Sequence, residues 1–250
     1  MSETKPLVYL VLGAVDSGRR EIVKDLIAGG LDASVNSVIF GSADEATESE
    51  VSWTWGDDDT LQADWPAEAT AGFFLADGRS DPVDLIEAFK PWAHRVGVEV
   101  ARVICVVHCR LLKEHPPTMH WYDACIHFSD IVLLNRREGL ENKWTSDYQA
   151  RFAKLFLPCL VEVVKKGRVK NPALVLDRLT RRLSHWFDTD EDEDWKSYVT
   201  DPDTIIMDED EDATGDEEES DAEEDEYLAR HPGGGRKKVL PDIRDYLSGD

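Results

Sequence analysis

Eight residues near the start of the chain, Gly-Ala-Val-Asp-Ser-Gly-Arg-Arg at positions 13–20, have the composition and spacing of a loop that binds phosphate. Four residues separate the two glycines, as in the pattern G-x-x-x-x-G-K-[ST]. Glycines let the backbone approach an anion closely, and the N–H groups of such a loop and of the following helix carry partial positive charge toward it. We therefore expect a ligand's phosphate groups to contact Gly13, Ala14, Val15, Asp16, Ser17, Gly18, Arg19 and Arg20.

The last two residues of this loop depart from the pattern. Arg19 stands where Lys is expected; it is also cationic and can hydrogen-bond phosphate, but its guanidinium is planar and larger than an ammonium group. Arg20 stands where a Ser or Thr hydroxyl would hold Mg²⁺, and a guanidinium cannot ligate a cation. The pattern argues against Mg²⁺ and against efficient hydrolysis. The alternative is a loop without a ligand, whose arginines pair with nearby acids.

Strands and helices must alternate to position this loop. Apolar runs predict strands over 7–12, 34–40, 72–76, 102–107, 130–134 and 160–164, and helical patterns predict helices over 21–28, 82–94, 119–127, 143–156 and 172–186. This alternation is typical of a three-layer α/β fold of the P-loop NTPase type with a mostly parallel sheet. In such sheets ligands bind at the carboxyl ends of the strands.

Residues 41–70 interrupt the alternation. The segment is acidic, contains Trp53, Trp55 and Trp65, and has the pattern of a short strand over 51–55. We favour an insertion whose tryptophans cover the edge of the sheet, and the alternative is a tryptophan-lined ligand surface.

The charge of the chain is concentrated in one segment. Residues 188–226 hold 22 of the 52 acidic residues and one of the 28 basic residues, a net charge of −21 that leaves −3 for the rest. We predict a nucleotide-binding domain over 1–187, a disordered acidic tail over 188–232, and a basic hinge with a short C-terminal peptide over 233–250. Such a tail repels nucleic acid and suits a basic protein partner or, within the chain, Arg19 and Arg20.

The remaining composition bears on location and on metals. The N-terminus has no signal pattern, no apolar run is long enough to span a membrane, and the four cysteines lack disulfide-like spacing, so we expect a cytoplasmic protein. A group of histidines and cysteines has residue types that bind zinc but none of the tight spacing of a zinc site, so no metal site is predicted. Its members are His108, Cys109, His115, His120, Cys125 and His127.

Three loops in order resemble the nucleotide-binding domain of the CobW-type P-loop GTPases, a metallochaperone-related family. Gly-Ala-Val-Asp-Ser-Gly at 13–18 resembles its glycine-rich loop. Asp-Gly-Arg-Ser-Asp-Pro at 77–82 is similar to its Glu-x-Thr-Gly-x-x-x-Pro stretch. Ile-Val-Leu-Leu-Asn-Arg-Arg-Glu at 131–138 is similar to its strand ending in Asn-Lys-x-Asp. Residues 161–177 are more weakly similar to the segment that closes the domain.

This resemblance implies a guanine nucleotide, GTP or GDP, as the ligand. It also implies a role for three residues at the guanine base. Glu138 accepts hydrogen bonds from the base, Asn135 supports the base and the loop, and the stem of Arg136 stacks on the ring. A capped strand-to-helix turn without a ligand is the alternative for the same residues.

The chain departs from the family at several positions that hold metal ions. Besides Arg19 and Arg20, Leu75 stands in place of the Walker B glutamate, and residues 41–70 lack the family's Cys-x-Cys-Cys motif. We expect a degenerate GTPase-like protein that binds guanine nucleotide weakly or without hydrolysis, has no catalytic residue, and works as a regulator or adaptor whose partner contacts the acidic tail. The alternatives are an active GTP-hydrolysing zinc or cobalt chaperone and a ligand-free interaction module.

Overall fold

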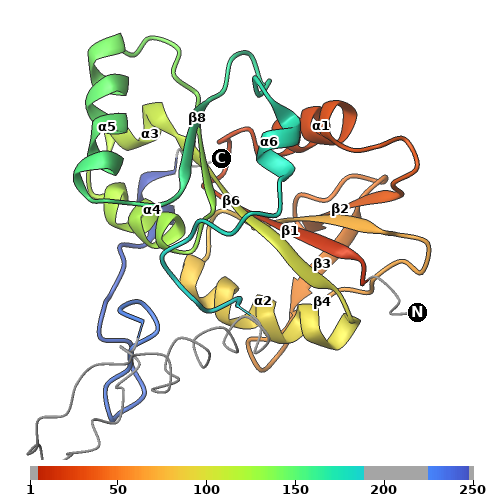
Figure 1. The fold of residues 1–250 in the computed structure, drawn as a ribbon. Coiled ribbons are helices and arrows are strands. Elements are labelled where there is room, and N and C mark those ends of the chain that lie inside the picture. The colour runs from red at the N-terminus through yellow and green to blue at the C-terminus, as the bar shows by residue number, and fades with distance from the viewer. Residues whose placement is uncertain (1–4, 189–224, 248–250) are drawn as a thin grey trace, which may run out of the picture. The chain divides into compact units, whose positions relative to one another are not determined.

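The computed structural model describes residues 5–188 and 225–247, and its central feature is one twisted sheet (Figure 1). The strands are β1 (Leu7–Leu12), β2 (Ser37–Ser42), β3 (Val51–Trp55), β4 (Leu61–Gln62), β5 (Ala71–Leu75), β6 (Glu99–His108), β7 (Ile131–Asn135) and β8 (Leu160–Val163). Their order in the sheet is β4-β3-β2-β5-β1-β6-β7-β8. All neighbours are parallel except β3 and β4, which confirms the predicted mostly parallel α/β class.

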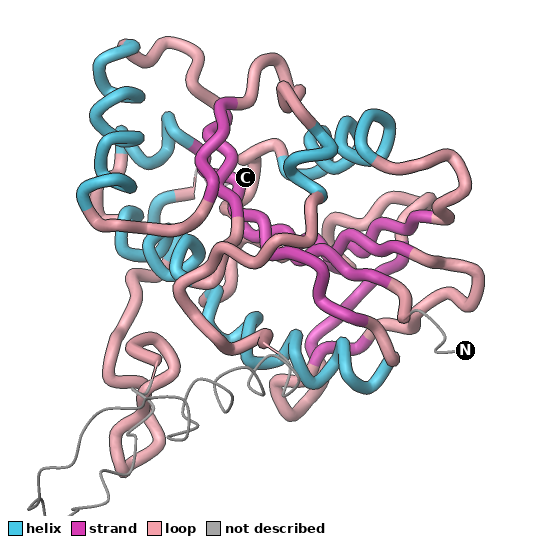
Figure 2. The backbone as a smooth tube through the Cα atoms, viewed as in Figure 1, coloured by secondary structure: helices cyan, strands magenta, loops and turns pink. Residues whose placement is uncertain are grey.

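Helices cover both faces of the sheet (Figure 2). They are α1 (Arg19–Gly30), α2 (Pro82–Val96), α3 (Cys109–Glu114), α4 (Thr118–His127), α5 (Asn142–Lys154) and α6 (Pro172–Leu176), with a final 3₁₀ helix η2 (Ile243–Tyr246). The chain divides into two compact units, residues 1–184 with 239–250 and residues 185–238. None of the helices in the described residues is long and apolar enough to cross a membrane.

Strand β1 lies in the middle of the sheet and carries the loop of interest at its carboxyl end. Successive side chains of a strand point to opposite faces, so a strand covered by helices on both sides must be apolar throughout. Tyr9 and Val11 belong to a core cluster with residues of α1 and α6, while Val8 and Leu10 are also completely buried. The unbroken apolar sequence of 7–12 therefore reflects the central position that the loop requires.

The predicted helix over 172–186 is wrong beyond its first turn and a half. Helix α6 ends at Leu176, and Leu179 and Leu183, which lie in the rest of the predicted helix, are 51% and 42% exposed. Buried Arg102 of β6 ends the helix, because its guanidinium donates to the carbonyls of Leu174 (2.7 Å), Val175 (3.1 Å) and Leu179 (3.2 Å). An apolar pattern alone cannot reveal a buried cation that takes these carbonyls.

A second buried charge holds the same segment. The carboxylate of Asp130 accepts hydrogen bonds from the backbone N–H of Arg181 (2.7 Å) and pairs with Arg182 (3.2 Å). The backbone N–H groups of Leu183 and Ser184 then donate to the carbonyl of His127, each over 3.2 Å. Residues 177–184 are thus fixed as an extended strap by polar contacts.

The insertion over 41–70 extends the sheet by β3 and β4. Trp53 is 1% exposed, stacks on Phe74 with ring centroids 5.1 Å apart, and donates from its indole N–H to the Leu75 carbonyl (2.9 Å). Trp65 stacks on Phe40 at 5.4 Å. These two rings pack against residues of β2 and β5, inside the sheet, whereas β4 forms its edge. The inserted segment therefore extends the sheet, and the expectation that Trp53 and Trp65 cover the sheet edge is wrong.

The C-terminal part is described from residue 225 onward, so the predicted acidic tail lies mostly outside the described residues. Within the unit of residues 185–238, residues 225–238 form a turn closed by a bridge between Arg230 and Arg236. Lys238 pairs with Glu226 (2.7 Å) and lies 3.7 Å from the ring centre of Tyr227. The predicted C-terminal peptide contains η2, which belongs to the other unit and contacts α4.

Candidate functional site

The loop over 13–20 joins β1 to α1, and its two glycines are required by close backbone packing. Gly13 has φ +135°, and a Cβ there would lie 2.3 Å from the carbonyl oxygen of Val106. Gly18 has φ +88°, precedes the first helical residue, and leaves a Cβ no room because Asn135 Nδ2 would be 2.4 Å away. The glycine spacing seen in the sequence therefore marks two points where the loop is pressed against β6 and β7.

Two further elements hold the loop in place. The carbonyl of Gly78, after β5, accepts a hydrogen bond from the Val15 N–H (3.3 Å). Beneath the loop, the buried hydroxyl of Tyr122 on α4 accepts from the His108 N–H (3.0 Å) and is hydrogen-bonded by the backbone of Ala14. Burial raises the pKa of Tyr122, which therefore stays neutral. No motif in the sequence singles out this tyrosine as part of the site.

Two of the three residues predicted at the guanine base meet the loop. The side chain of Asn135, 5% exposed, donates to the Ser17 carbonyl (2.8 Å). Arg136 has φ +51°, donates from Nε to the Asp16 carbonyl (2.7 Å), and approaches Glu21 to 3.5 Å. Glu138, the third, is exposed in the turn that follows and lines neither of the cavities described below.

Arg19 is turned toward the end of β5. Its side chain is 6% exposed, and its guanidinium donates to the carbonyls of Ala76 and Asp77 and lies 3.8 Å from Glu45. Burial lowers the pKa of Arg19, and the nearby Glu45 opposes that shift. Arg19 thus connects the loop to the end of β5. Its charge is partly neutralised by Glu45.

Arg20 is held by the connection between β2 and β3. Its Nε and Nη2 atoms donate to the two carboxylate oxygens of Glu50 over 2.7 and 3.0 Å, and Nη2 also donates to the Glu45 carbonyl (2.9 Å). The hydrogen bond to Glu50 raises the pKa of Arg20. Burial works to raise the pKa of Glu50, but hydrogen bonds from Arg20 and from the Thr47 N–H outweigh it, so that pKa is lowered.

Glu45 and Glu50 were not singled out in the sequence. They lie in an acidic segment in which the sequence does not distinguish one carboxylate from another. Only the folded structure shows which two pair with Arg19 and Arg20. Glu45 also pairs with Arg79 of the loop after β5. Both arginines of the loop are therefore already paired with acids in the first unit, which removes them as free targets for the acidic tail.

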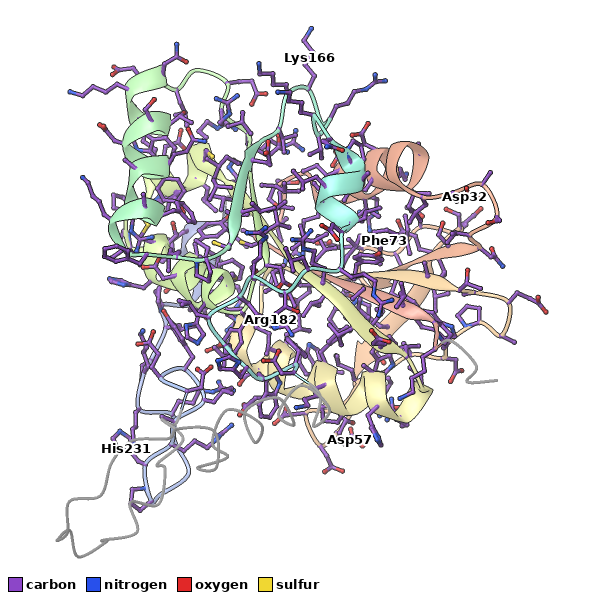
Figure 3. All side chains as sticks on the ribbon, in the orientation of Figure 1. Asp32, Asp57, Phe73, Lys166, Arg182 and His231 are labelled. Atoms are coloured by element: carbon purple, nitrogen blue, oxygen red, sulfur yellow. The ribbon has the colours of Figure 1, made fainter. Side chains whose placement is uncertain are left out.

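Two adjoining cavities border the loop. The first, of 320 Å³, is lined by loop residues including Val15, Asp16 and Gly18, together with Arg19, Arg20 and Leu75. The second, of 480 Å³, is lined by Asn135 and by Lys166, Gly167 and Arg168 of the loop after β8. Figure 3 shows Lys166 projecting outward from this loop. Glu21, Lys24 and Arg136 line both cavities, so the two lie next to each other along α1.

The residues at this site do not fit Mg²⁺. Arg20, committed to Glu50, occupies the position of the hydroxyl ligand, and Leu75, 4% exposed, occupies the position of the acidic one. Three or more His, Cys, Asp or Glu side chains do not gather as a possible metal site anywhere in the described residues. The four cysteines are free and buried, and burial raises the pKa of Cys109 and of Cys159 to about 12.

Comparisons with known proteins find similar folds only. No family model matches the chain, and no curated protein matches it significantly.

The chain is similar to two solved structures. The zinc-bound YjiA GTPase from E. coli is 14% identical, with a TM-score of 0.44. A zinc-bound triple mutant of YjiA GTPase is 13% identical, with a TM-score of 0.46. Each match covers 72% of this chain and 67% of the other. Because both TM-scores lie below 0.5, the fold assignment rests on the sheet order and the loop geometry.

Proposed function

We propose that this chain is a degenerate, CobW-like P-loop protein that binds a guanine nucleotide weakly, without Mg²⁺ and without hydrolysing it, as a regulator or adaptor. The phosphates contact the backbone of Asp16 and Gly18 and the start of α1, which line the first cavity. The base occupies the cavity beside Asn135 and Arg136.

One observation supports this proposal: close backbone packing requires the two glycines of the loop, whereas Arg20 and Leu75 stand where the sequence resemblance expects groups that hold a metal ion. Gly13 and Gly18 still press the loop against β6 and β7, and a cavity of 320 Å³ borders the start of α1. Backbone N–H groups and a helix N-terminus bind phosphate whatever the side chains are. Arg20, paired with Glu50, offers no Mg²⁺ ligand.

Lys24 is the cation best placed to contact a bound nucleotide. It is exposed on α1 and lines both cavities, so it borders the phosphates as well as the base. A flexible ammonium group in that position adds a charge-assisted hydrogen bond to a phosphate.

The test is equilibrium binding of fluorescent GDP, GTP and ATP to the full chain, in Mg²⁺ and in EDTA. We expect binding of GDP and GTP with the same affinity in both, weaker binding of ATP, and no phosphate release. Lys24→Ala weakens the binding about tenfold, the loss of one contact to phosphate. Lys170→Ala, an exposed change outside both cavities, leaves it unchanged. Hydrolysis that requires Mg²⁺ and disappears in Arg19→Ala contradicts the proposal.

A second candidate function is a ligand-free interaction module, and the pairing of the loop arginines favours it. Arg19 already donates to two carbonyls and Arg20 to a carboxylate, so the loop is stable without an anion. No stabilisation of the folded chain by millimolar GDP or GTP, and no fluorescence change on titration, favours this second candidate.

A further inference from the structure

The C-terminal segment, residues 239–247, folds back on the unit that contains the phosphate loop. Residues 239–247 belong to the same compact unit as residues 5–184, although the chain between them forms a unit of its own. Within this segment η2 contacts α4, and Figure 1 shows the blue end of the chain beside that helix. The segment therefore belongs to the first unit although residues 185–238 separate it from the rest of that unit in sequence.

One side chain anchors the segment. Ile243 is 1% exposed, whereas Val239, four residues earlier, is 86% exposed. The ring of Tyr246 lies 5.6 Å from that of His115, in the connection between α3 and α4. A short peptide that buries one aliphatic side chain beside one aromatic contact has the contact pattern of peptide recognition by a groove.

The segment is preorganised for this contact by its own polar residues. The carboxylate of Asp242 accepts from the Arg244 N–H (3.0 Å) and pairs with the Arg244 guanidinium (2.6 Å), closing the turn in which Ile243 sits. A turn that is closed locally loses less conformational entropy when it docks.

The receiving surface is held by contacts that do not involve the segment. On α4, Trp121 donates to the Ser80 carbonyl (3.3 Å), and Tyr122 is fixed beneath the phosphate loop. These contacts of α4 are made to residues outside the segment. A binding site differs from a part of the core in this respect: its surface is held by contacts that do not include the bound peptide.

We propose that the surface formed by α4 and the α3–α4 connection is a peptide-binding site whose resident ligand is the chain's own C-terminal segment. The ligand chemistry is an aliphatic residue in an Asp-capped turn, followed by an aromatic residue. A single buried anchor binds weakly in free solution, but the chain between residues 184 and 239 tethers the segment and keeps its local concentration high. An outside peptide of the same chemistry occupies the site only when the resident segment leaves it.

The first experiment adds a labelled synthetic peptide of residues 239–250 to three full-length proteins and follows its anisotropy. Ile243→Asp places a charge at the buried anchor and empties the site, while Val239→Ser changes an exposed residue of the same segment. We expect the peptide to bind the Ile243→Asp protein at least tenfold more tightly than the wild type or Val239→Ser. Equal binding to all three, or no binding to the Ile243→Asp protein at millimolar concentration, overturns the proposal.

A second measurement needs no added peptide. Arg244 lies within η2, so trypsin can cut after it only when the segment is undocked. With Ile243→Ala, which shortens the anchor without placing an acid next to Arg244, cleavage after Arg244 is expected to be at least tenfold faster than in the wild type or Val239→Ser. Thermal unfolding of the rest of the chain is expected to be unchanged. Equal cleavage rates contradict docking.

Discussion

Glu50 is the residue on which the interpretation of the phosphate loop depends. Its side chain is 2% exposed and accepts two hydrogen bonds from Arg20, so it neutralises a guanidinium that the sequence presents as a ligand for phosphate. A bidentate pair of this kind is geometrically demanding and stronger than a surface ion pair. The acid therefore both positions Arg20 and fixes the connection between β2 and β3.

Glu50→Gln tests this role. The amide keeps the shape but loses the charge and one of the two acceptors, which leaves part of the Arg20 guanidinium unpaired. We expect the free energy of unfolding in urea to fall by about 1–3 kcal/mol. Glu48→Gln, an exposed change in the same connection, serves as the control with an effect below about 0.5 kcal/mol. A loss as small as that of the control would show that the pair is dispensable.

At the scale of single residues, the sequence indicated where the loop needs glycine but not which acids pair with its arginines. A glycine pattern indicates positions where the backbone has no room for a side chain. Gly13 and Gly18 are such positions, because they pack against β6 and β7. The partners of Arg19 and Arg20 come from a connection some thirty residues away, and charge alone does not say which acid meets which base. The guanine-binding roles of Asn135, Arg136 and Glu138 stay predictions.

At the scale of elements, apolar patterns predicted the strands well because each central strand is buried on both faces. Strand β1 occupies the predicted residues 7–12, and β3 the predicted 51–55. The failure at 172–186 has a polar cause: Arg102 and Asp130 take the backbone groups that would continue α6. Helix α3 was missed because six residues are too few to establish a helical period.

Arg102→Met tests the polar termination of α6. The substitution keeps an apolar stem but leaves three carbonyls without the donors that they meet in the fold. We expect a loss of about 3 kcal/mol in the free energy of unfolding, measured in urea. Arg178→Met, an exposed change that removes the pair with Glu99, should cost no more than about 1 kcal/mol. Equal effects of the two changes would argue against a special role for Arg102.

At the scale of the whole molecule, charge and composition predicted the division into a nearly neutral domain and an acidic segment. The structure describes the domain, and residues 189–224 of the acidic segment lie outside the described residues. The sequence did not predict that residues 239–250 return to the first unit, because a short segment with one buried anchor has no periodic signal.

The stability of the folded chain depends on pH through His108. Burial lowers its pKa in the folded state, and Arg110 and Arg136 add to the effect, while its Nδ1 accepts the Leu111 N–H (3.1 Å). The unfolded chain takes up a proton below a pKa of about 6.5 and the folded chain resists it, so the free energy of unfolding falls as the pH drops below that value.

His108→Asn removes this titration but keeps an acceptor for the Leu111 N–H. The decrease in unfolding free energy between pH 7.5 and pH 5.5, measured in urea, is therefore smaller in the variant than in the wild type. Because the other histidines are common to both proteins, their contributions cancel in the comparison. An identical decrease in both would mean that His108 does not contribute.

Helix α4 contacts the chain both before and after residues 185–238, which form the second unit. Leu183 and Ser184 donate to His127 at its C-terminal end, and η2 returns to contact the same helix. The first unit therefore binds the chain just before and just after residues 185–238, through hydrogen bonds and packing contacts rather than a covalent link. Closing a loop costs only about 0.6 kcal/mol more for each doubling of its length. The acidic segment can therefore differ in length and composition between related chains while the first unit keeps its stability.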